Sequence, residues 1–290
     1  MTKPLLSVVI PTWNRAQLVC EAVGSALQQR PGAVEVIVVD DASTDDTVAR
    51  LENTYGSRIR LLQRASQGGP GAARNAGAAL ASGEFVGFLD SDDVWRDGKL
   101  DAELRVFAEF PEANTVVSDS QSYFEGALDG PTRFTQNGLL AATQGRVRNA
   151  DDCNWLWTNS TLTAHTCGIT VRREVLARIG RCLFAEDLRC CEDWEFQMRV
   201  YQLGHVFVLP EVLESVRRFN DDSRLGRGIP GQERTRAQEL LLLRSRLVVI
   251  ERSQSWLHGL RPELAAELER FRLETEAQLA RLSAKAMIAS

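Results

Sequence analysis

The feature that most constrains the fold is a regular alternation of apolar runs with helical segments over residues 5–120. Four runs predict strands: "LLSVVI" (5–10), which is rich in β-branched residues, and "VEVIVVD" (34–40) as buried strands, followed by "RIRLLQ" (58–63) and "EFVGFLD" (84–90). Segments with helical spacing follow them at 15–29, 43–56, 69–83 and 97–110, and we expect Pro11 to end the first strand. This alternation predicts an α/β fold with a single, mostly parallel sheet flanked by helices. Ligands of such sheets bind beyond the carboxyl ends of the strands.

The second half of the chain continues the pattern less regularly. The further predicted elements are a strand (114–120), a strand and helix (167–180), a helix (192–204) and a short strand (205–210). Residues 121–166 are rich in polar side chains and show no clear period. Residues 233–289 are charged and Leu-rich, which predicts two amphipathic helices broken near 258–263. We therefore expect one domain over residues 1–232 and a C-terminal helical extension over 233–290.

Composition excludes several classes of protein. A net charge of −5 argues against a general nucleic-acid binder, because such proteins need a basic surface. No apolar run approaches the roughly 18 to 20 residues of a membrane span, and the first apolar run is too short for a signal peptide. The six cysteines contain no CxxC pair, which favours reduced thiols in a cytoplasmic protein.

Acidic side chains follow two of the predicted strands. "FLDSDDVW" places Asp90, Asp92 and Asp93 directly after the fourth strand, and these charges repel one another unless water or a cation intervenes. The stretch is either a solvated loop or a metal–phosphate site. "VVDDASTDDT" ends the second strand with Asp40 and Asp41, which either bind a ligand N–H or cap the next helix, where Ser43 is the expected N-cap.

Two further stretches carry charged residues at predicted helix starts. "QGGPGAARNAG" (67–77) offers free N–H groups and the cation of Arg74 to a phosphate, or else it is a small-residue helix packed close to the sheet. It belongs to the third crossover, whereas a dinucleotide fingerprint opens the first. "CCEDWEF" places Glu192 and Asp193 where the helix dipole stabilises anions, and one of them could serve as a general base.

Taken together, "SVVIPTWNR", "VVDDASTDDT", "GGPGAARNAG", "GEFVGFLDSDD" and "EDWE" closely resemble family 2 of the inverting GT-A glycosyltransferases. The resemblance is strong over 5–120 and looser over 165–220. It implies a GT-A fold, with a nucleotide-sugar-binding half at 1–120 and an acceptor-side half at 121–232.

The resemblance assigns donor-binding roles to individual residues. Pro11, Thr12 and Trp13 match the segment that walls the nucleotide base, with Trp13 as the stacking aromatic. The residues that it further implies in nucleotide-sugar binding are Arg15, Asp41 (on the ring N–H of the base), Gly69, Arg74, Asn75, Asp90, Ser91 and Asp92. The implied donor is a UDP- or dTDP-sugar.

The resemblance also implies a cofactor and a catalytic base. Asp90 and Asp92 form the DxD motif that binds Mg²⁺ or Mn²⁺, and Asp193 matches the catalytic base. Many family members add a downstream His, but none stands between residues 206 and 257 here. The third protein ligand therefore stays open, with Arg217, Arg218 and Asn220 as candidate substitutes near the phosphates.

The implied function is transfer of a sugar to an acceptor hydroxyl by metal-assisted single displacement, in glycan, surface polysaccharide or glycoconjugate synthesis. A sugar nucleotidylyltransferase is one alternative, although "IPTWNR" lacks the Gly-rich basic loop which that class carries after its first strand. The other is a degenerate transferase that binds nucleotide without catalysis. For the 233–290 extension we expect packing on the domain or a homodimer, with peripheral contact at the inner face of a membrane as the alternative.

Overall fold

The computed structural model describes residues 3–124, 127–139, 145, 147–149, 152–153, 163–217, 234–256 and 262–287. The strands are β1 (Leu6–Thr12), β2 (Val34–Asp40), β3 (Arg60–Gln63), β4 (Phe85–Phe88), β5 (Val94–Trp95), β6 (Ala113–Phe124), β7 (Ala127–Asp129), β8 (Val147–Arg148), β9 (Ile169–Arg172) and β10 (His205–Arg217). The helices are α1 (Ala16–Leu27), α2 (Thr47–Tyr55), α3 (Gly69–Ala78), α4 (Lys99–Glu109), α5 (Arg133–Gln136), α7 (Arg173–Ile179), α8 (Glu192–Gln202), α9 (Arg236–Trp256) and α10 (Pro262–Met287).

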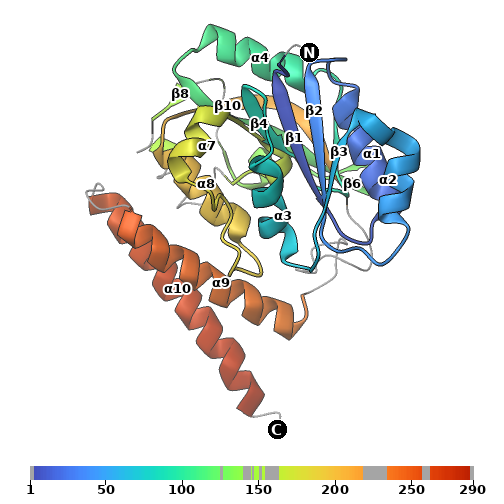
Figure 1. Cartoon of the computed structure of the whole chain (residues 1–290). Helices are drawn as coiled ribbons and strands as arrows, with labels where there is room; N and C mark the ends of the chain where they lie inside the picture. The colour runs from blue at the N-terminus through green and yellow to red at the C-terminus, as the bar shows by residue number, and fades with distance from the viewer. Residues whose placement is uncertain are drawn as a thin grey trace.

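One mixed sheet forms the centre of the molecule, with helices on both of its faces (Figure 1). Its strand order is β3-β2-β1-β4-β9-β6-β10-β5, with β7 paired to β6 and β8 to β10. The four strands from β3 to β4 run parallel, and β6 runs parallel to β10. The strands that run antiparallel to their neighbours are β5, β7, β8 and β9, of which β9 lies between β4 and β6. The predicted mostly parallel sheet is confirmed, and the carboxyl ends of β1, β2, β4, β6 and β10 share one edge.

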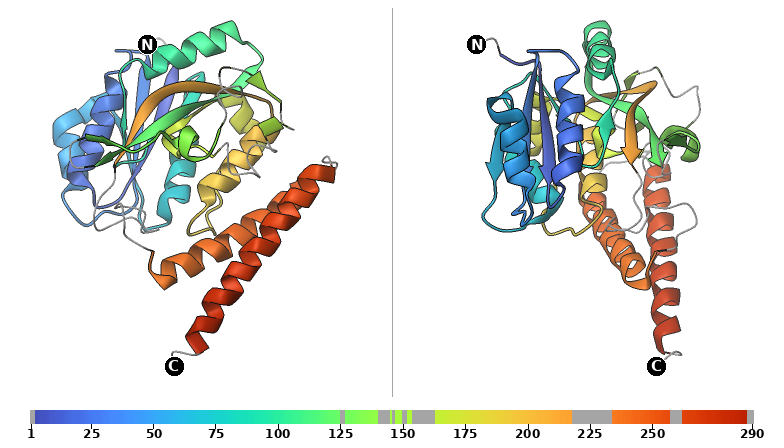
Figure 2. Two further views of the ribbon diagram at one scale, coloured as in Figure 1. Left: turned by 180° about the vertical axis from the view of Figure 1, so that it is seen from behind. Right: turned by 90° about the vertical axis from the view of Figure 1, so that its right-hand side faces the viewer.

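Alternate residues of the central strand serve two cores. Leu6, Val8 and Ile10 pack with apolar side chains of α1, α2 and α4, whereas Val9 belongs to the cluster built from α7 and α8. This period of two follows from the opposite directions of successive side chains in a strand. Figure 2 shows the helices disposed on the two sides of the sheet. Strands buried on both faces are expected to be mostly apolar, as β1 and β2 are over residues 8–11 and 36–39.

Helix α3 approaches the sheet closely. A Cβ atom added at Gly77 would collide with Val9 of β1 and Val39 of β2, so only glycine fits there. The sequence offered two interpretations of "GPGAARNAG", and the structure shows one of them, a small-residue helix packed close to the sheet. Because α3 starts at the ligand edge of the sheet, the same packing fixes the position of its first turn.

Three strands end later than predicted. β1 continues through Pro11 to Thr12. An N–H at position 11 would face β4, but the pairing of β4 with β1 has already ended at Val9, so proline costs no sheet hydrogen bond there. β10 passes Pro210 by register shifts and extends to Arg217. β6 likewise extends to Phe124, and the two-residue β5, which no sequence signal predicted, pairs with β10.

Helix α2 begins at Thr47, four residues later than expected, and Ser43 is not its N-cap. The Ser43 N–H donates to Asp40 Oδ2 at 3.0 Å, and its hydroxyl accepts the Asn14 N–H at 2.8 Å. Ser43 therefore joins the loops after β1 and β2. Polar residues such as Ser compete for backbone groups in this way, which is why they mark both caps and turns.

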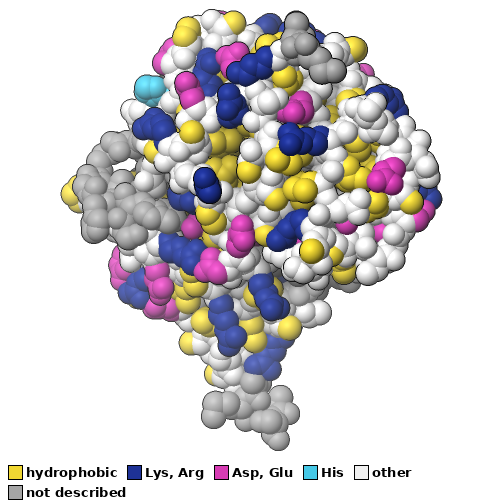
Figure 3. Space-filling view, in the orientation of Figure 1, with side chains coloured by type: hydrophobic (Ala, Val, Ile, Leu, Met, Phe, Trp, Pro, Cys, Tyr) yellow, Lys and Arg dark blue, Asp and Glu magenta, His cyan; other side chains and the backbone are white. Residues whose placement is uncertain are grey.

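The C-terminal extension forms two long helices, as predicted, with α9 and α10 packed side by side beneath α8 (Figures 1 and 2). The predicted break at 258–263 coincides with the end of α9 and the start of α10, although residues 257–261 lie outside the described chain. None of the described helices combines the length and apolarity that crossing a membrane requires. Acidic and basic side chains are interspersed over the face drawn in Figure 3.

Candidate active site

A cleft of about 310 Å³ opens at the carboxyl ends of β1, β2 and β4. Its lining residues are Pro11, Thr12, Trp13, Arg15, Asp41, Pro70, Ala73, Arg74, Asp90, Ser91 and Asp92. Nine of them are residues that the sequence predicted to bind a nucleotide sugar. The parallel register explains how distant motifs meet, because Thr12 lies opposite Asp40 and Val9 opposite Phe88. The volume is at the lower end of the range for small-molecule sites.

The loop after β1 presents an aromatic ring at this cleft. Trp13 is 41% exposed, although a large apolar side chain normally gains by burial. The loop itself is held firmly: besides the bond between Asn14 and Ser43, the Arg15 N–H donates to Thr47 Oγ1 at 3.0 Å. An exposed ring on a fixed loop is suited to stacking on a planar ligand.

Asp41 holds the start of α3. Its carboxylate accepts the N–H of Gly68 at 3.0 Å and that of Gly69 at 2.7 Å, and it is paired with Arg64. These N–H groups at the start of a helix have no partner within the helix, so a carboxylate there is stabilising. The predicted contact of Asp41 with a nucleotide base stays a prediction. Gly69 lies beside Asp41 but is not part of the cleft lining.

Each carboxylate of the DxD pair lies beside an arginine. Arg15 Nη1 is 2.6 Å from Asp92 Oδ2, and Arg74 Nη2 is 2.6 Å from Asp90 Oδ1. Removal from water raises the pKa of Asp92, and the nearby Asp90 adds to the rise while Arg15 opposes it. Both carboxylates keep about a third of their surface exposed at the cleft, 32% for Asp90 and 29% for Asp92. They are accessible to a ligand.

The donor set fits a hard divalent cation. Mg²⁺ is commonly held by one or two carboxylates and completes its shell with water and substrate phosphate oxygens. Asp90 and Asp92 supply two such carboxylates at one cleft. Within the described ranges no group of three or more His, Cys, Asp and Glu side chains could hold a metal. The side chains of Arg217, Arg218 and Asn220, considered above as substitutes for a third ligand, lie outside the described residues.

Arg74 links the DxD loop to helix α8. Its side chain is 5% exposed, and its second bond goes from Nη1 to Glu192 Oε1 at 3.1 Å. The guanidinium also lies 5.2 Å from the ring centroid of Phe184. Burial alone would lower the pKa of Arg74, but the carboxylates of Asp90 and Glu192 raise it, so the cation is firmly held. The sequence offered Glu192 only as one of two candidate bases and did not predict its contact with Arg74, which is 118 positions away.

Asp193 lies in the first turn of α8, directly after Glu192. It is partly buried, and its Oδ1 accepts the N–H of Trp194 at 2.9 Å. Desolvation, reinforced by the charge of Glu192 and opposed by Arg74, raises the pKa of Asp193 to about 7. A carboxylate with a pKa near neutrality is well matched to general-base catalysis. Asp193 does not line the cleft around Asp90 and Asp92.

Asn75 points away from the cleft. Its amide nitrogen donates to the Phe184 carbonyl at 2.8 Å and to Glu186 Oε1 at 2.9 Å, and its oxygen accepts the Phe184 N–H at 2.8 Å. This geometry makes Asn75 a clamp between α3 and the segment before α8. Its predicted role in nucleotide-sugar binding remains untested.

The cleft also contains residues that the motifs did not single out. Pro70 and Ala73 line it from the same side of α3 as Arg74, and Arg64 reaches Asp41 from the loop after β3. The spacing of residues 70, 73 and 74 on one helix face was the available signal for the first two. A single arginine after a strand gives no comparable signal for Arg64.

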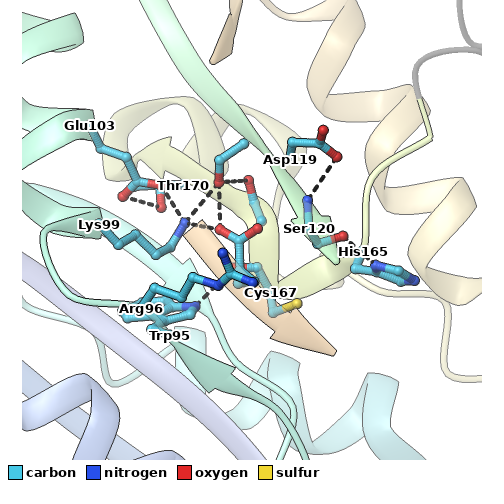
Figure 4. Close-up of polar contacts among 12 residues, drawn as sticks. Trp95, Arg96, Lys99, Glu103, Asp119, Ser120, His165, Cys167 and Thr170 are labelled. Carbon is cyan, nitrogen blue, oxygen red and sulfur yellow. Dashed lines mark hydrogen bonds and ion pairs between the residues drawn. The ribbon is translucent and has the colours of Figure 1, made fainter. Parts of the chain in front are cut away.

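A buried ionic cluster follows the DxD loop (Figure 4). The ammonium of Lys99 donates to Glu103 and Glu214 at 2.6 Å each and to Ser118 at 3.0 Å, and all three charged side chains are at most 1% exposed. The cluster joins α4, β6 and β10. Asp93 is buried at the turn before β5, where its N–H donates to the Asp90 carbonyl at 3.0 Å.

His165 lies near the carboxyl-terminal edge of the sheet. Its Nδ1 lies 2.7 Å from Ser120 Oγ, at the carboxyl-terminal part of β6. His205 begins β10 at the opposite edge.

Solved structures share this fold. S. aureus TarS 1–349 in complex with UDP-GlcNAc superposes with a TM-score of 0.64 at 21% identity, over 96% of this chain and 71% of that chain. The mannosyltransferase PcManGT from Pyrobaculum calidifontis, in complex with GDP-Man and Mn²⁺, gives a TM-score of 0.65 at 20% identity, over 100% and 77%. At these identities the likeness shows the fold alone. It confirms the expected GT-A architecture.

Curated relatives match part of the sequence. An uncharacterized glycosyltransferase of Nostoc sp. is 34% identical over 179 residues, 60% of this chain and 52% of the relative. The E. coli protein WfgD, named a UDP-Glc:alpha-D-GlcNAc-diphosphoundecaprenol beta-1,3-glucosyltransferase, is 32% identical over 140 residues, 47% and 55% of the two chains. The chain thus spans about half the length of these relatives.

The family assignment rests on a match to the family as a whole. Residues 7–180, more than half of the chain, match the family described as Glycosyl transferase family 2. That range includes the cleft-lining residues from β1 to the DxD loop, and it ends before α8. The chain therefore belongs to glycosyl transferase family 2.

Proposed function

We propose that this chain transfers a sugar from a nucleoside diphosphate sugar, with uridine as the favoured nucleoside, to an acceptor hydroxyl with inversion. One observation carries the proposal: Arg74 connects a DxD carboxylate of the cleft, Asp90, to the turn of α8 that contains Asp193. The carboxylate proposed to bind the leaving diphosphate through a cation is thus linked by Arg74 to the neighbour of the carboxylate proposed to remove the proton.

The cleft matches the parts of such a donor. Trp13 offers an exposed ring to the base, while Arg15 and Arg74 offer cations to the phosphates. The uridine preference is supported by the names of similar proteins, since WfgD is named for UDP-Glc and TarS was solved with UDP-GlcNAc. GDP-Man in PcManGT is the contrary case.

The DxD residues would hold a divalent cation together with the diphosphate. Such a cation supplies positive charge that stabilises the leaving diphosphate. The chain's own contribution is to keep Asp90 and Asp92 in place, through Arg74 and Arg15 respectively. When phosphate oxygens arrive, the same arginines can turn to them, because guanidinium groups pair with carboxylate and phosphate alike.

Asp193 is the proposed general base. Its carboxylate takes the proton of the acceptor hydroxyl while the hydroxyl oxygen forms a bond to the anomeric carbon. The bond between that carbon and the diphosphate oxygen breaks in the same step, so the configuration inverts. The transition state has the positive charge on the sugar that is typical of glycosyl transfer. A single displacement of this kind needs no covalent intermediate.

A thermal-shift screen of nucleotide sugars, with and without Mn²⁺, tests donor binding. A ligand at about 100 times its Kd adds roughly 2.7 kcal/mol of stability, so a bound donor raises the melting temperature. We expect UDP-sugars to raise it more than dTDP- or GDP-sugars do. Trp13→Ala should reduce the shift, and Trp13→Phe should keep most of it. The proposal fails if no nucleotide sugar stabilises the protein, or if Trp13→Ala leaves the shift unchanged.

A further inference from the structure

The C-terminal helices contact the part of α8 that contains Asp193. In both views of Figure 2 and in Figure 1, α9 lies next to α8, and α10 lies along α9. The sequence left open whether this extension packs on the domain, forms a dimer or meets a membrane. Its contacts on α8 show that it packs on the domain beside Asp193.

Arg246 of α9 is placed between two aromatic rings. Its guanidinium carbon is 5.1 Å from the ring centroid of Trp194 and 5.1 Å from that of Phe271 on α10. Trp194 is the residue directly after Asp193, and its N–H is the one that Asp193 Oδ1 accepts. A guanidinium over a ring contributes about 0.5 to 2 kcal/mol, depending on its exposure. Arg246 therefore attaches both C-terminal helices to the neighbour of the proposed base.

Two further contacts attach α9 on either side of that turn. Arg252 Nη1 pairs with Glu195 Oε1 at 3.4 Å and with Asp187 Oδ1 at 3.2 Å. The Cys190 thiol lies 3.7 Å from the Leu241 carbonyl of α9 and donates to it. Residues 190, 194 and 195 are thus all held by α9, and they bracket Asp193 in the sequence.

The first turn of α8 starts from an unfavourable backbone conformation. Its N-cap, Cys191, is in the left-handed region with φ 65°, and within the described chain no side chain caps the turn through that residue. Such a conformation is unfavourable for a non-glycine residue and persists only when surrounding contacts impose it. Arg74 supplies one such contact from the donor side through Glu192. The helices α9 and α10 supply the others.

We propose that α9 and α10 are a positioning element for Asp193, with Arg246 as the residue that fixes the turn through Trp194. The proposal rests on the function proposed above and adds that the base is aligned by the C-terminal extension. Misplacing a reacting group by about 1 Å can cost on the order of 100-fold in rate. Donor binding, by contrast, uses β1, β2, α3 and β4, none of which the Arg246 contacts involve.

The test compares Arg246→Ala with Arg270→Ala in the full chain. Arg270 is the matched control, because it forms ion pairs with Glu267 and Glu274 of α10 alone. We expect Arg246→Ala to speed amide hydrogen exchange at residues 191–196, to lower kcat about tenfold or more, and to leave the donor KM and the Kd of UDP unchanged. Arg246→Lys, which keeps a cation over the rings, should restore most of kcat. Arg270→Ala should leave exchange and kinetics as in the wild type.

Wild-type exchange at 191–196 and wild-type kcat in a folded Arg246→Ala protein would overturn the proposal. So would a loss of UDP binding in proportion to the loss of kcat, because it would indicate general damage. If Arg246→Ala does not fold, Arg252→Ala replaces it with the same expected and contradicting results. Hydrogen exchange needs no substrate, so a wild type that turns over no nucleotide sugar contradicts the proposed function while the exchange result still decides the positioning role.

Discussion

At the scale of single residues, the site is built from groups held in unfavourable states by their neighbours. The three described non-glycine residues with positive φ are Asn14, Ala42 and Cys191. Each is close in sequence to a predicted site residue. Asn14 follows Trp13, Ala42 follows Asp41, and Cys191 is two positions before Asp193. Strain of this kind concentrates at functional sites, where surrounding structure compensates for it. Asp193 is held in an unfavourable electrostatic state as well, because desolvation raises its pKa to about 7.

The raised pKa of Asp193 predicts a pH dependence. A general base acts when it is deprotonated, so kcat/KM should rise with pH through about 7 and level off above it. Glu192→Gln should move this midpoint to lower pH, because the charge of Glu192 helps to raise the pKa of Asp193, while Gln can still accept the bond from Arg74. The apparent value belongs to the coupled pair.

Steady-state profiles between about pH 5 and 9 would check this, because that range brackets the raised pKa of Asp193. Glu174→Gln, at an exposed position of α7, is the control and should leave the midpoint unchanged. A flat profile in the wild type, or an identical midpoint in Glu192→Gln, would contradict the assignment of Asp193 as the titrating base.

The sequence predicted most of the cleft because its residues follow strands. Once β1, β2 and β4 are parallel neighbours, the residues after them must meet, which places Trp13, Asp41 and Asp90 together. The pairing of Arg74 with Glu192 could not be predicted in this way. It depends on the position of α8, which is set by packing between distant segments and leaves no local pattern.

At the scale of elements, the strand boundaries show where local signals fail. Pro11 and Pro210 were natural stops by propensity, yet β1 and β10 continue past them. Pro11 is tolerated because the neighbouring strand β4 has already stopped pairing with β1. Pro210 is tolerated because the register between β10 and β6 shifts at that point. The two-residue β5 is determined by pairing alone, and it leads directly into the cluster around Lys99.

That cluster yields a prediction for stability. Lys99→Met would leave Glu103 and Glu214 buried together without their cation, and removal of one partner from a buried ion pair costs about 3 to 5 kcal/mol. Urea unfolding followed by circular dichroism should show a loss of this size. Lys3→Met, at an exposed lysine, is the control and should change stability by less than about 0.5 kcal/mol. A comparably small loss in Lys99→Met would mean that the cluster contributes little to the sheet.

At the scale of the whole molecule, the helices α9 and α10 meet the sheet domain at the first turn of α8, which contains the proposed base. The predicted boundary at residue 232 stays a prediction, but the contacts of α9 on α8 argue that the two parts act together. The sequence predicted the two helices from their periodicity, whereas it could not predict their docking. Docking depends on a few specific side chains, Arg246 and Arg252 among them, within a surface of mixed charge.

The central claim is that this molecule is a glycosyltransferase in which Asp193 removes the acceptor proton, and Asp193→Asn tests it most directly. Asn keeps the size of the side chain and an oxygen for the Trp194 N–H, but it cannot take up a proton. With the nucleotide sugar that stabilises the wild type most, we expect UDP release in the presence of acceptor to fall at least about 100-fold. The Kd of UDP, measured by calorimetry, should stay at the wild-type value. Turnover that survives Asp193→Asn unchanged, or a parallel loss of nucleotide binding, would contradict the account.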